Sequence, residues 1–285
     1  MLILGCSNSS ELAGRISQEL GGEVAEVEIK RFPDGEIYVR VVSDVKGKEC
    51  AVVQSTPDNG SLVELILTLD LLRDLGASRI HAVVPYLGYC RQEKRFQDGE
   101  ALSAKTVLKI IDSLSDSILT VNCHFLDAGG EFDFNGIKLK NIDAFPEIAN
   151  YFKGKVESPF LIAPDEGSLE LVKNSAGIVG CEFDSLEKER ISGEEVKTEA
   201  KEMGVEGKDV IILDDAISTG NTIINAAKLV REQGAKSVSA GCVHGIFSNG
   251  LEKLKAAADE VVCTDTVQGD ASRVSVAKLI AKELG

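Results

Sequence analysis

The sequence lacks the segments that mark membrane, secreted and zinc-binding proteins. No apolar run reaches the roughly 20 residues that span a bilayer, and the start, MLILGCSNSS, has neither the basic region nor the longer apolar stretch of a signal peptide. The seven cysteines include no C-x-x-C pair, and their dispersal favours buried, reduced thiols over disulfides or structural zinc. We therefore expect a cytoplasmic protein with no membrane partner.

Positive charge is also scarce. The chain has 31 Lys and Arg against 46 Asp and Glu, a net charge of −15. Most of such a surface repels the phosphates of nucleic acid, so we expect no nucleic-acid partner. An anionic ligand must be held by a local group of cations and backbone amides, which favours small phosphorylated ligands. The acidity also fits general solubility or adaptation to a salt-rich cytoplasm.

The pattern along the chain is that of an α/β protein. With 285 residues, 44% hydrophobic and 27% charged, the sequence is long enough for one large or two ordinary globular domains, and we expect two. Short β-branched runs alternate with segments of helical period, which predicts largely parallel sheets flanked by helices. No short repeat is visible, although an old duplication of one α/β unit stays open.

The expected elements can be placed approximately. Strands are expected near Leu2–Cys6, Val24–Ile29, Ile37–Val42, Cys50–Gln54, Ile80–Val84, Ile118–Val121, Phe160–Ala163, Ile178–Phe183, Val210–Leu213, Val238–Val243 and Glu260–Cys263. Helices are expected near Glu11–Leu20, Leu62–Leu75, Leu102–Leu114, Leu169–Lys173, Thr222–Gln233, Gly250–Ala258 and Ser272–Leu284. A loop at Asp127–Lys138 precedes the expected boundary between domains 1–142 and 143–285, and the C-terminal helix is a candidate to pack back on the first domain.

The strongest local motif is VIILDDAISTGNT, residues 210–222. A strand buried on both faces is followed by two aspartates and a Ser/Thr/Gly loop that leads into a helix, at the sheet edge where α/β proteins bind ligands. The loop amides and hydroxyls suit a phosphate, and the carboxylates suit the vicinal diol of a sugar. The alternative is an ordinary helix cap with solvated acids. The residues predicted to bind ribose 5-phosphate are Asp214, Asp215, Ser218, Thr219, Gly220 and Thr222.

This motif resembles the phosphoribosyl-diphosphate-binding segment shared by type I phosphoribosyltransferases and ribose-phosphate diphosphokinases. A second segment, RFPDGEIYVR at 31–40, resembles the adenine-holding hairpin of the diphosphokinases. The resemblance implies that Phe32, Asp34 and Glu36 bind ATP in a neighbouring subunit's site, and hence a homo-oligomer with its active site at a subunit interface. Without the resemblance, these residues are a Pro-Asp-Gly turn between two strands.

The segment PYLGYCRQEKRF, residues 85–96, resembles the ATP-binding stretch of the same family. The resemblance implies nucleotide contacts from Arg91, Gln92 and Lys94, and cations after a strand are what a triphosphate needs in an acidic protein. A solvated basic face is the alternative.

Two further segments imply a site for Mg²⁺. His124 follows a strand and matches the family histidine near the metal and the ATP phosphates. Asp165 ends another strand and matches a family aspartate that helps to hold Mg²⁺, directly or through water. A lone histidine is otherwise more often structural. The chain departs from many members at Asn122, where they carry an aspartate, and at Ser218 and Gly220, where they carry acidic or Cys residues. We interpret both as variation within an active family.

The segment SLEKERISGEEV, residues 185–196, resembles the catalytic loop of the diphosphokinases and by default would be a plain surface loop. The resemblance implies that Lys188 and Arg190 are catalytic, closing over the reacting phosphates. Because the motifs keep the family order over nearly the whole chain, a ribose-phosphate diphosphokinase is expected, with ATP as co-substrate. The resemblance implies two phosphoribosyltransferase-type (Rossmann-like) domains, the first on the ATP side and the second on the ribose 5-phosphate side. A type I phosphoribosyltransferase and a catalytically silent regulatory homologue are the alternatives.

Overall fold

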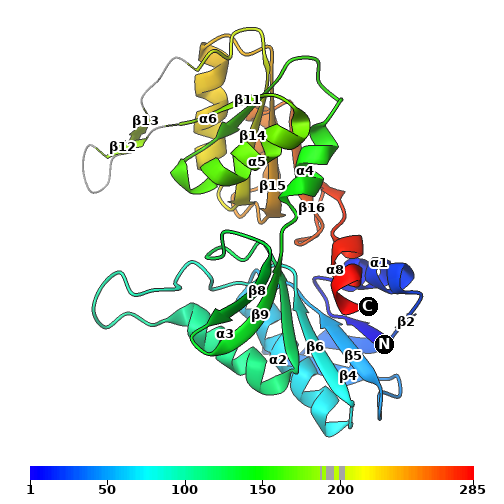
Figure 1. The fold of residues 1–285 in the computed structure, drawn as a ribbon. Coiled ribbons are helices and arrows are strands. Elements are labelled where there is room, and N and C mark those ends of the chain that lie inside the picture. The colour runs from blue at the N-terminus through cyan, green and yellow to red at the C-terminus, as the bar shows by residue number, and fades with distance from the viewer. Residues whose placement is uncertain (187, 191–195, 199–202) are drawn as a thin grey trace. The chain divides into compact units, whose positions relative to one another are not determined.

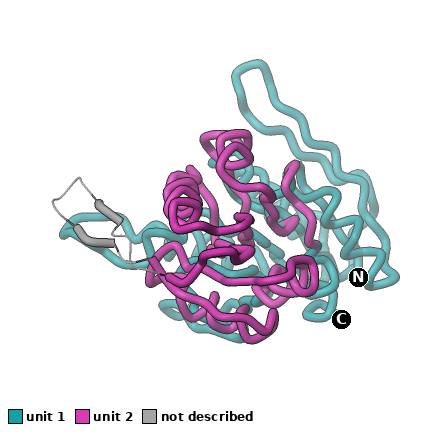
Figure 2. Tube along the Cα trace, turned by 90° about the horizontal axis from the view of Figure 1, so that it is seen from above, with its two compact units in different colours: residues 1–143, 266–268, 275–285 teal, residues 144–265, 269–274 magenta. Residues whose placement is uncertain are grey.

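The chain is seen in a computed structural model. It describes residues 1–186, 188–190, 196–198 and 203–285, and the side chains of 1–186 and 203–285. The chain divides into two compact units, coloured separately in Figure 2. Unit 1 comprises residues 1–143, 266–268 and 275–285, and unit 2 comprises residues 144–265 and 269–274. The last helix therefore belongs to the same unit as the first strand.

Unit 1 is built on a sheet that is parallel except at one edge, where β8 and β9 are antiparallel. In spatial order the described strands of this sheet are β2 (Glu23–Val24), β1 (Leu2–Gly5), β5 (Glu49–Val53), β6 (Arg79–Val84), β7 (Ser117–Val121), β9 (Ile137–Ile142) and β8 (Gly130–Phe134). A separate antiparallel ribbon is formed by β3 (Val27–Arg31) and β4 (Ile37–Val41).

Successive strand residues point to opposite sides of this sheet, and apolar side chains lie on both sides. Helices therefore cover both of its faces. In β1, Leu2 and Leu4 pack into the core cluster that also contains Leu65 of α2. Gly5 points the other way, since a Cβ there would lie 2.7 Å from the Cβ of Ala13 in α1. Beside α1 lies α8 (Figure 1). The helices of unit 1 are α1 (Ser10–Leu20), α2 (Asn59–Asp74), α3 (Ser103–Leu114) and α8 (Ala277–Leu284).

Unit 2 contains a fully parallel sheet with helices on both faces. Its described strands run in the order β11 (Glu182–Ser185), β10 (Pro159–Ala163), β14 (Asp209–Ile217), β15 (Ser237–Gly245), β16 (Glu260–Thr264) and β17 (Ser272–Val274). Its helices are α4 (Phe145–Phe152), the short 3₁₀ turn η1 (Glu166–Ser168), α5 (Leu169–Val179), α6 (Asn221–Glu232) and α7 (Leu251–Ala257). A further antiparallel pair is β12 (Lys188–Arg190) with β13 (Val196–Thr198). The expected α/β class is confirmed. Among the described helices, none has the length and apolar content needed to cross a bilayer.

The prediction of a loop at Asp127–Lys138 is wrong, because most of this segment forms the β8–β9 hairpin. Asn135 and Gly136 join the two strands with φ angles of 57° and 84°. Two consecutive positive φ angles define the tight turn that matches strand twist, and Asn-Gly is its usual sequence. The glycines and acidic residues that suggested a loop are therefore hairpin residues.

Several other expected elements differ from the structure in their bounds, among them the helix expected at Leu169–Lys173, which continues to Val179. The strand expected at Ile178–Phe183 starts only at Glu182, because α5 continues to Val179 and ends at Gly180 with a φ of 82°. The helix expected at Ser272–Leu284 begins with strand β17 and becomes helical at Ala277. The strand expected at Val24–Ile29 is split between β2 and β3. Helix α4, with Pro146 in its first turn, was not expected.

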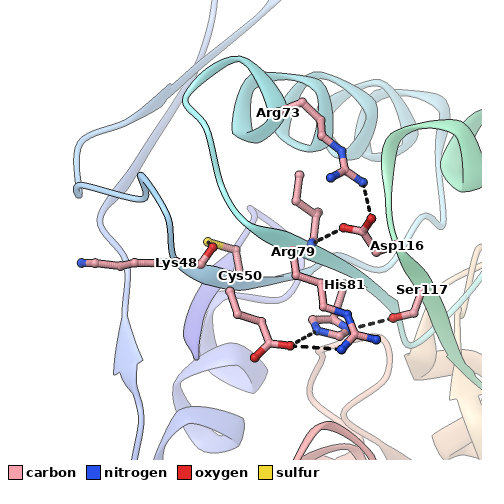
Figure 3. Close-up of polar contacts among 9 residues, drawn as sticks. Lys48, Cys50, Arg73, Arg79, His81, Asp116 and Ser117 are labelled. Atoms are coloured by element: carbon pink, nitrogen blue, oxygen red, sulfur yellow. Dashed lines mark hydrogen bonds and ion pairs between the residues drawn. The ribbon is translucent and has the colours of Figure 1, made fainter.

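A polar network closes the amino ends of β5, β6 and β7 in unit 1 (Figure 3). His81 contacts Ser117 through Nδ1 at 2.7 Å and Glu49 through Nε2 at 2.8 Å. Because a carboxylate only accepts, Nε2 donates to Glu49, and this hydrogen bond lowers the pKa of the Glu49 carboxyl. Arg73 forms an ion pair with Asp116 at 2.9 Å. The polar side chains at this edge therefore satisfy one another's hydrogen-bonding groups across three strands.

A cavity of about 780 Å³ opens at this amino edge. Its lining includes Arg79, His81 and Ser117 but none of the residues predicted to bind substrates. The predicted residues that follow strands lie instead at carboxyl ends, where parallel α/β sheets bind ligands.

Candidate active site

Three carboxylates gather at the carboxyl edge of the sheet in unit 2. Asp214 and Asp215 lie in the last part of β14, and Asp165 follows β10, the neighbouring strand. The Oδ1 of Asp165 accepts hydrogen bonds from the Gly167 amide at 3.1 Å and the Ser168 hydroxyl at 3.4 Å. These bonds fix the Asp165 side chain, and the fold therefore brings three predicted site residues together.

The position of Asp214 within this group changes its protonation. Burial, followed by the charges of Asp215 and Asp165, raises the pKa of Asp214 from 3.8 to about 8. A carboxyl group with such a pKa keeps its proton at neutral pH unless a bound cation or a hydrogen-bond donor stabilises the carboxylate. Carboxylate oxygens are the ligands that Mg²⁺ prefers, so the chemistry of this group fits a divalent cation or a sugar diol. Among the side chains that the structure describes, however, no group of three or more His, Cys, Asp or Glu has an arrangement that could hold a metal ion.

The loop between β14 and α6 is held in a tight conformation next to these acids. Gly220 has a φ of 80°, and a Cβ on it would lie 2.1 Å from Cδ1 of Leu254 in α7. The Ser218 carbonyl accepts a hydrogen bond from the Ser248 amide at 2.9 Å. Thr219 is exposed, so its hydroxyl lies at the surface of the loop.

This loop leads directly into α6, whose first turn contains no acidic residue and includes the half-buried Thr222. Backbone amides at the start of a helix, with hydroxyl side chains beside them, can bind a phosphate. The loop thus places a potential phosphate site beside the carboxylates of Asp214 and Asp215.

In unit 1, the stretch after β6 is shaped by close backbone contacts. A Cβ on Gly88 would lie 2.3 Å from the Thr56 carbonyl oxygen, while the Gly88 amide donates to Thr56 Oγ1 at 2.9 Å. Tyr89 has a φ of 66°, which is uncommon for a bulky residue, and its hydroxyl donates to Asn59 at the start of α2. The chain therefore leaves the sheet in a fixed direction before it reaches Arg91.

The predicted nucleotide residues of this stretch line a small cavity. Its volume is about 340 Å³, and its lining residues are Tyr89, Arg91, Gln92, Phe96 and Ser103. Arg91 is exposed, whereas Gln92 is half-buried and accepts a hydrogen bond from the Ser103 hydroxyl at 3.1 Å. Lys94 lies outside the lining, with its Nζ 5.3 Å from the centre of the Phe96 ring.

The predicted adenine-binding residues lie at the tip of the β3–β4 ribbon. Phe32 is 51% exposed and meets the Tyr38 ring edge-on at 6.1 Å. Asp34 and Glu36 are also exposed, and Asp34 Oδ1 accepts a hydrogen bond from the Glu36 amide at 3.2 Å. Gly35, with a φ of 95°, closes the turn. An exposed ring with carboxylates beside it suits the binding of an aminated heterocycle.

His124 is exposed in the turn that follows β7. Near it, Asn122 is only 7% exposed, has a φ of 37° and donates its side-chain amide to Asp143 Oδ1 at 3.1 Å. Asp143 was not predicted as a site residue, because strand β9, which it follows, was not expected from the sequence. It provides a carboxylate beside the residue that replaces the usual family aspartate.

The predicted residues thus form two sets. Lys188 and Arg190 have described backbones, which pair with Thr198 and Val196, but their side chains lie outside the described residues. The residues in unit 1 are Phe32, Asp34, Glu36, Arg91, Gln92, Lys94 and His124, and those in unit 2 are Asp165, Lys188, Arg190, Asp214, Asp215, Ser218, Thr219, Gly220 and Thr222.

Comparison with known proteins assigns both units to one enzyme. Residues 1–114 match the N-terminal domain of ribose phosphate pyrophosphokinase, and residues 138–277 match the phosphoribosyl transferase domain. Ribose-phosphate pyrophosphokinase 2 of Archaeoglobus fulgidus is 44% identical over 286 residues, covering 100% of both chains. The ribose-phosphate pyrophosphokinase of Methanothermobacter thermautotrophicus is 42% identical over 98% of each chain.

A solved structure extends the likeness to the fold. The phosphoribosylpyrophosphate synthetase of Mycobacterium smegmatis superimposes with a TM-score of 0.84 at 28% identity, over 99% of this chain and 97% of the other. Because the sequence relatives and this structure span essentially the whole chain, the protein belongs to the ribose-phosphate pyrophosphokinase (ribose-phosphate diphosphokinase) family.

Proposed function

We propose that the protein is a ribose-phosphate diphosphokinase that transfers the β,γ-diphosphoryl group of ATP to the 1-hydroxyl of ribose 5-phosphate, giving phosphoribosyl diphosphate and AMP for nucleotide biosynthesis. The observation that carries the proposal is the match of residues 1–114 to the N-terminal domain of ribose phosphate pyrophosphokinase. A phosphoribosyltransferase would require only the domain type that matches residues 138–277.

Ribose 5-phosphate binding is proposed for the edge of unit 2. The amides and hydroxyls of Ser218, Thr219, Gly220 and Thr222 would hold the 5-phosphate at the start of α6. The carboxylates of Asp214 and Asp215, near the end of β14, would accept hydrogen bonds from the 2- and 3-hydroxyls of the sugar. This geometry leaves the anomeric carbon and its 1-hydroxyl directed away from the phosphate loop.

ATP binding is proposed for two segments of unit 1. Arg91, Gln92 and Lys94 would contact the phosphates and nucleotide, supported by the cavity of about 340 Å³ beside Arg91 and Gln92. The exposed Phe32, with Asp34 and Glu36, would hold adenine in the site of a neighbouring subunit, so a homo-oligomer is part of the proposal.

Mg²⁺ is the proposed cofactor, with His124 and Asp165 as its protein contacts. The raised pKa of Asp214 next to Asp165 supports a cation at this edge, because mutual repulsion of the carboxylates is relieved by positive charge. When bound, Mg²⁺ would neutralise part of the charge on the transferred phosphates.

Protein side chains would complete the transfer through alignment and charge. The 1-hydroxyl oxygen attacks the β-phosphorus in line, the bond from that phosphorus to the AMP oxygen breaks, and the protein needs no covalent intermediate. Lys188 and Arg190 would stabilise the developing charge as their loop covers the phosphates and excludes water.

A direct assay tests the activity. Purified protein is incubated with ATP, ribose 5-phosphate and Mg²⁺ without any nucleobase, and AMP and phosphoribosyl diphosphate are quantified by ³¹P NMR. Equal amounts of the two products, both dependent on ribose 5-phosphate, are expected. A phosphoribosyltransferase would instead consume added phosphoribosyl diphosphate only when a nucleobase is present. Failure to form AMP by freshly purified oligomer would refute the proposal and favour a silent regulatory homologue.

A further inference from the structure

Two cysteines that lie after neighbouring strands of unit 1 are in direct contact. The Cys123 thiol donates to the sulfur of Cys90, with the two Sγ atoms 3.4 Å apart. Each residue is only 3% exposed, and both are free thiols. Cys90 immediately precedes Arg91, and Cys123 immediately precedes His124. The contact therefore joins the two segments of unit 1 that carry predicted nucleotide and metal residues.

We propose that Cys90 and Cys123 are an oxidative modification site that forms an intramolecular disulfide, linking the nucleotide-binding stretch to the His124 turn. A disulfide has an S–S length of about 2.05 Å, so the sulfurs must approach by about 1.4 Å from their 3.4 Å separation. Both residues lie beyond the ends of their strands, β6 and β7. The Cys123 amide donates to the Asn141 side chain at 2.9 Å and not to a backbone carbonyl, so the sulfurs can approach without breaking the backbone hydrogen bonds between the strands.

A second pair of buried cysteines, whose side chains also interact, differs in its position within the strands. Cys242 and Cys263 are register partners within the parallel strands β15 and β16, and both are fully buried. Neighbouring strands stand about 4.8 Å apart, whereas the Cβ atoms of a disulfide are about 3.8 Å apart. Since β15 and β16 each pair with strands on both sides, closing this gap would distort the sheet. Oxidation should therefore select Cys90 and Cys123.

The reaction balances with a peroxide as the oxidant. One cysteine sulfur attacks a peroxide oxygen, the O–O bond breaks, and a sulfenic acid and water form. The second sulfur attacks the sulfenic sulfur, the S–O bond breaks, and the S–S bond forms as a second water leaves. The two thiols lose two electrons and hydrogen peroxide gains them. Because both sulfurs are buried, the oxidant reaches them only when the stretch after β6 opens, so the reaction should be slow.

The disulfide should reduce the proposed diphosphokinase activity, a consequence that rests on that proposed function. Drawing the segments together would shift Arg91 and His124 by up to about 1 Å, and displacements of this size can cost about 10² in rate. We expect turnover to fall more than about tenfold on oxidation and to return when dithiothreitol reduces the bond.

The experiment measures the disulfide without relying on activity. The full-length protein is treated with hydrogen peroxide, its remaining thiols are alkylated with N-ethylmaleimide in urea, and non-reduced tryptic peptides are analysed by mass spectrometry. Trypsin places Cys90 in peptide 80–91 and Cys123 in peptide 110–138, each as the sole cysteine. The expected product is these two peptides joined, lighter by two hydrogen atoms than their sum.

Variants make the result specific. Cys90→Ala and Cys123→Ala should each abolish the cross-linked peptide and keep turnover unchanged after peroxide treatment, while Cys242→Ser should behave like the parent. Recovery of Cys90 and Cys123 as alkylated thiols, or a cross-link that joins other cysteines, would overturn the proposal. Because the cross-link is read by mass, its absence leaves the diphosphokinase assignment intact, and absence of AMP formation leaves the cross-link result intact.

Discussion

Substitution of Gly220 by alanine tests whether the loop at residues 218–222, the proposed phosphate site, requires a residue without a side chain. Gly220 has a φ of 80°, where alanine is strained, and an added Cβ would lie 2.1 Å from Leu254 Cδ1. Gly207 is a matched control in the same unit, because it has a φ of 69° but nothing within 4 Å of an added Cβ. The two variants separate backbone strain from steric overlap.

The expected cost follows from adding the two effects. Left-handed backbone costs a residue with a Cβ about 1–2 kcal/mol, and overpacking a buried site costs about 1–3 kcal/mol. Gly220→Ala should therefore lower the free energy of unfolding by about 2–5 kcal/mol, a fall in Tm on the order of 10 °C. Gly207→Ala should carry only the backbone part, about 1–2 kcal/mol.

Urea unfolding monitored by circular dichroism measures both variants. A double variant with Leu254→Ala should recover the steric part, so its loss should be smaller than the sum of the single losses by about 1–3 kcal/mol. Binding of ribose 5-phosphate to Gly220→Ala, measured by calorimetry below its unfolding temperature, should weaken. If Gly220→Ala unfolds within about 0.5 kcal/mol of Gly207→Ala, the steric reasoning is refuted.

The remaining predictions concern catalysis and protonation. Lys188→Ala should lower kcat more than about tenfold, or about 1.4 kcal/mol, with little change in the KM for ribose 5-phosphate. Lys197→Ala, on the paired strand, should leave kcat unchanged. Equal losses of kcat in the two variants, measured by steady-state assays, would contradict the role of Lys188. Phe32→Ala should raise the KM for ATP about tenfold, whereas Val42→Ala, a control at another exposed apolar residue, should not. Mixing Phe32→Ala with Lys188→Ala subunits should regain activity if the hairpin acts across an interface. The pKa of Asp214 is about 8 in the folded protein against an ordinary value of 3.8, so the native state binds the proton more tightly than the unfolded state. The stabilisation that comes from this protonation is therefore lost as pH rises from about 4 to 8. Urea titrations in EDTA should therefore show Asp214→Asn gaining on the parent, by up to about 1.4 kcal/mol per pH unit, and a pH-independent difference would count against the raised pKa.

Much of the fold could be predicted from the sequence because parallel strands are continuous apolar runs. The segment Val210–Leu213 is an example, since it is buried on both faces and is bounded by charged residues. The β8–β9 hairpin was not expected, although acidic and apolar residues alternate in β8, because the glycines around it also fit a loop. The Asn135-Gly136 turn was the decisive signal and was present in the sequence.

The candidate site was predictable only where a motif is continuous. The run from Asp214 to Thr222 contains the strand end, the loop and the helix start, so its local geometry follows from its order. Contacts between distant segments could not be predicted in this way. The Cys90–Cys123 contact and the hydrogen bond from Asn122 to Asp143 depend on which strands become neighbours, and periodicity alone does not give strand order.

The return of the C-terminus to unit 1 has a consequence for synthesis of the protein. Helix α8 buries Ala277 and Ile280 in unit 1 and contacts α1, and the Ser55 hydroxyl donates to the Thr266 carbonyl in the same unit. On a translating ribosome, the half that emerges first must wait for the final residues before its sheet is fully covered. Residues 144–265 already contain most of unit 2, so this later half of the chain can complete its fold before the earlier half does.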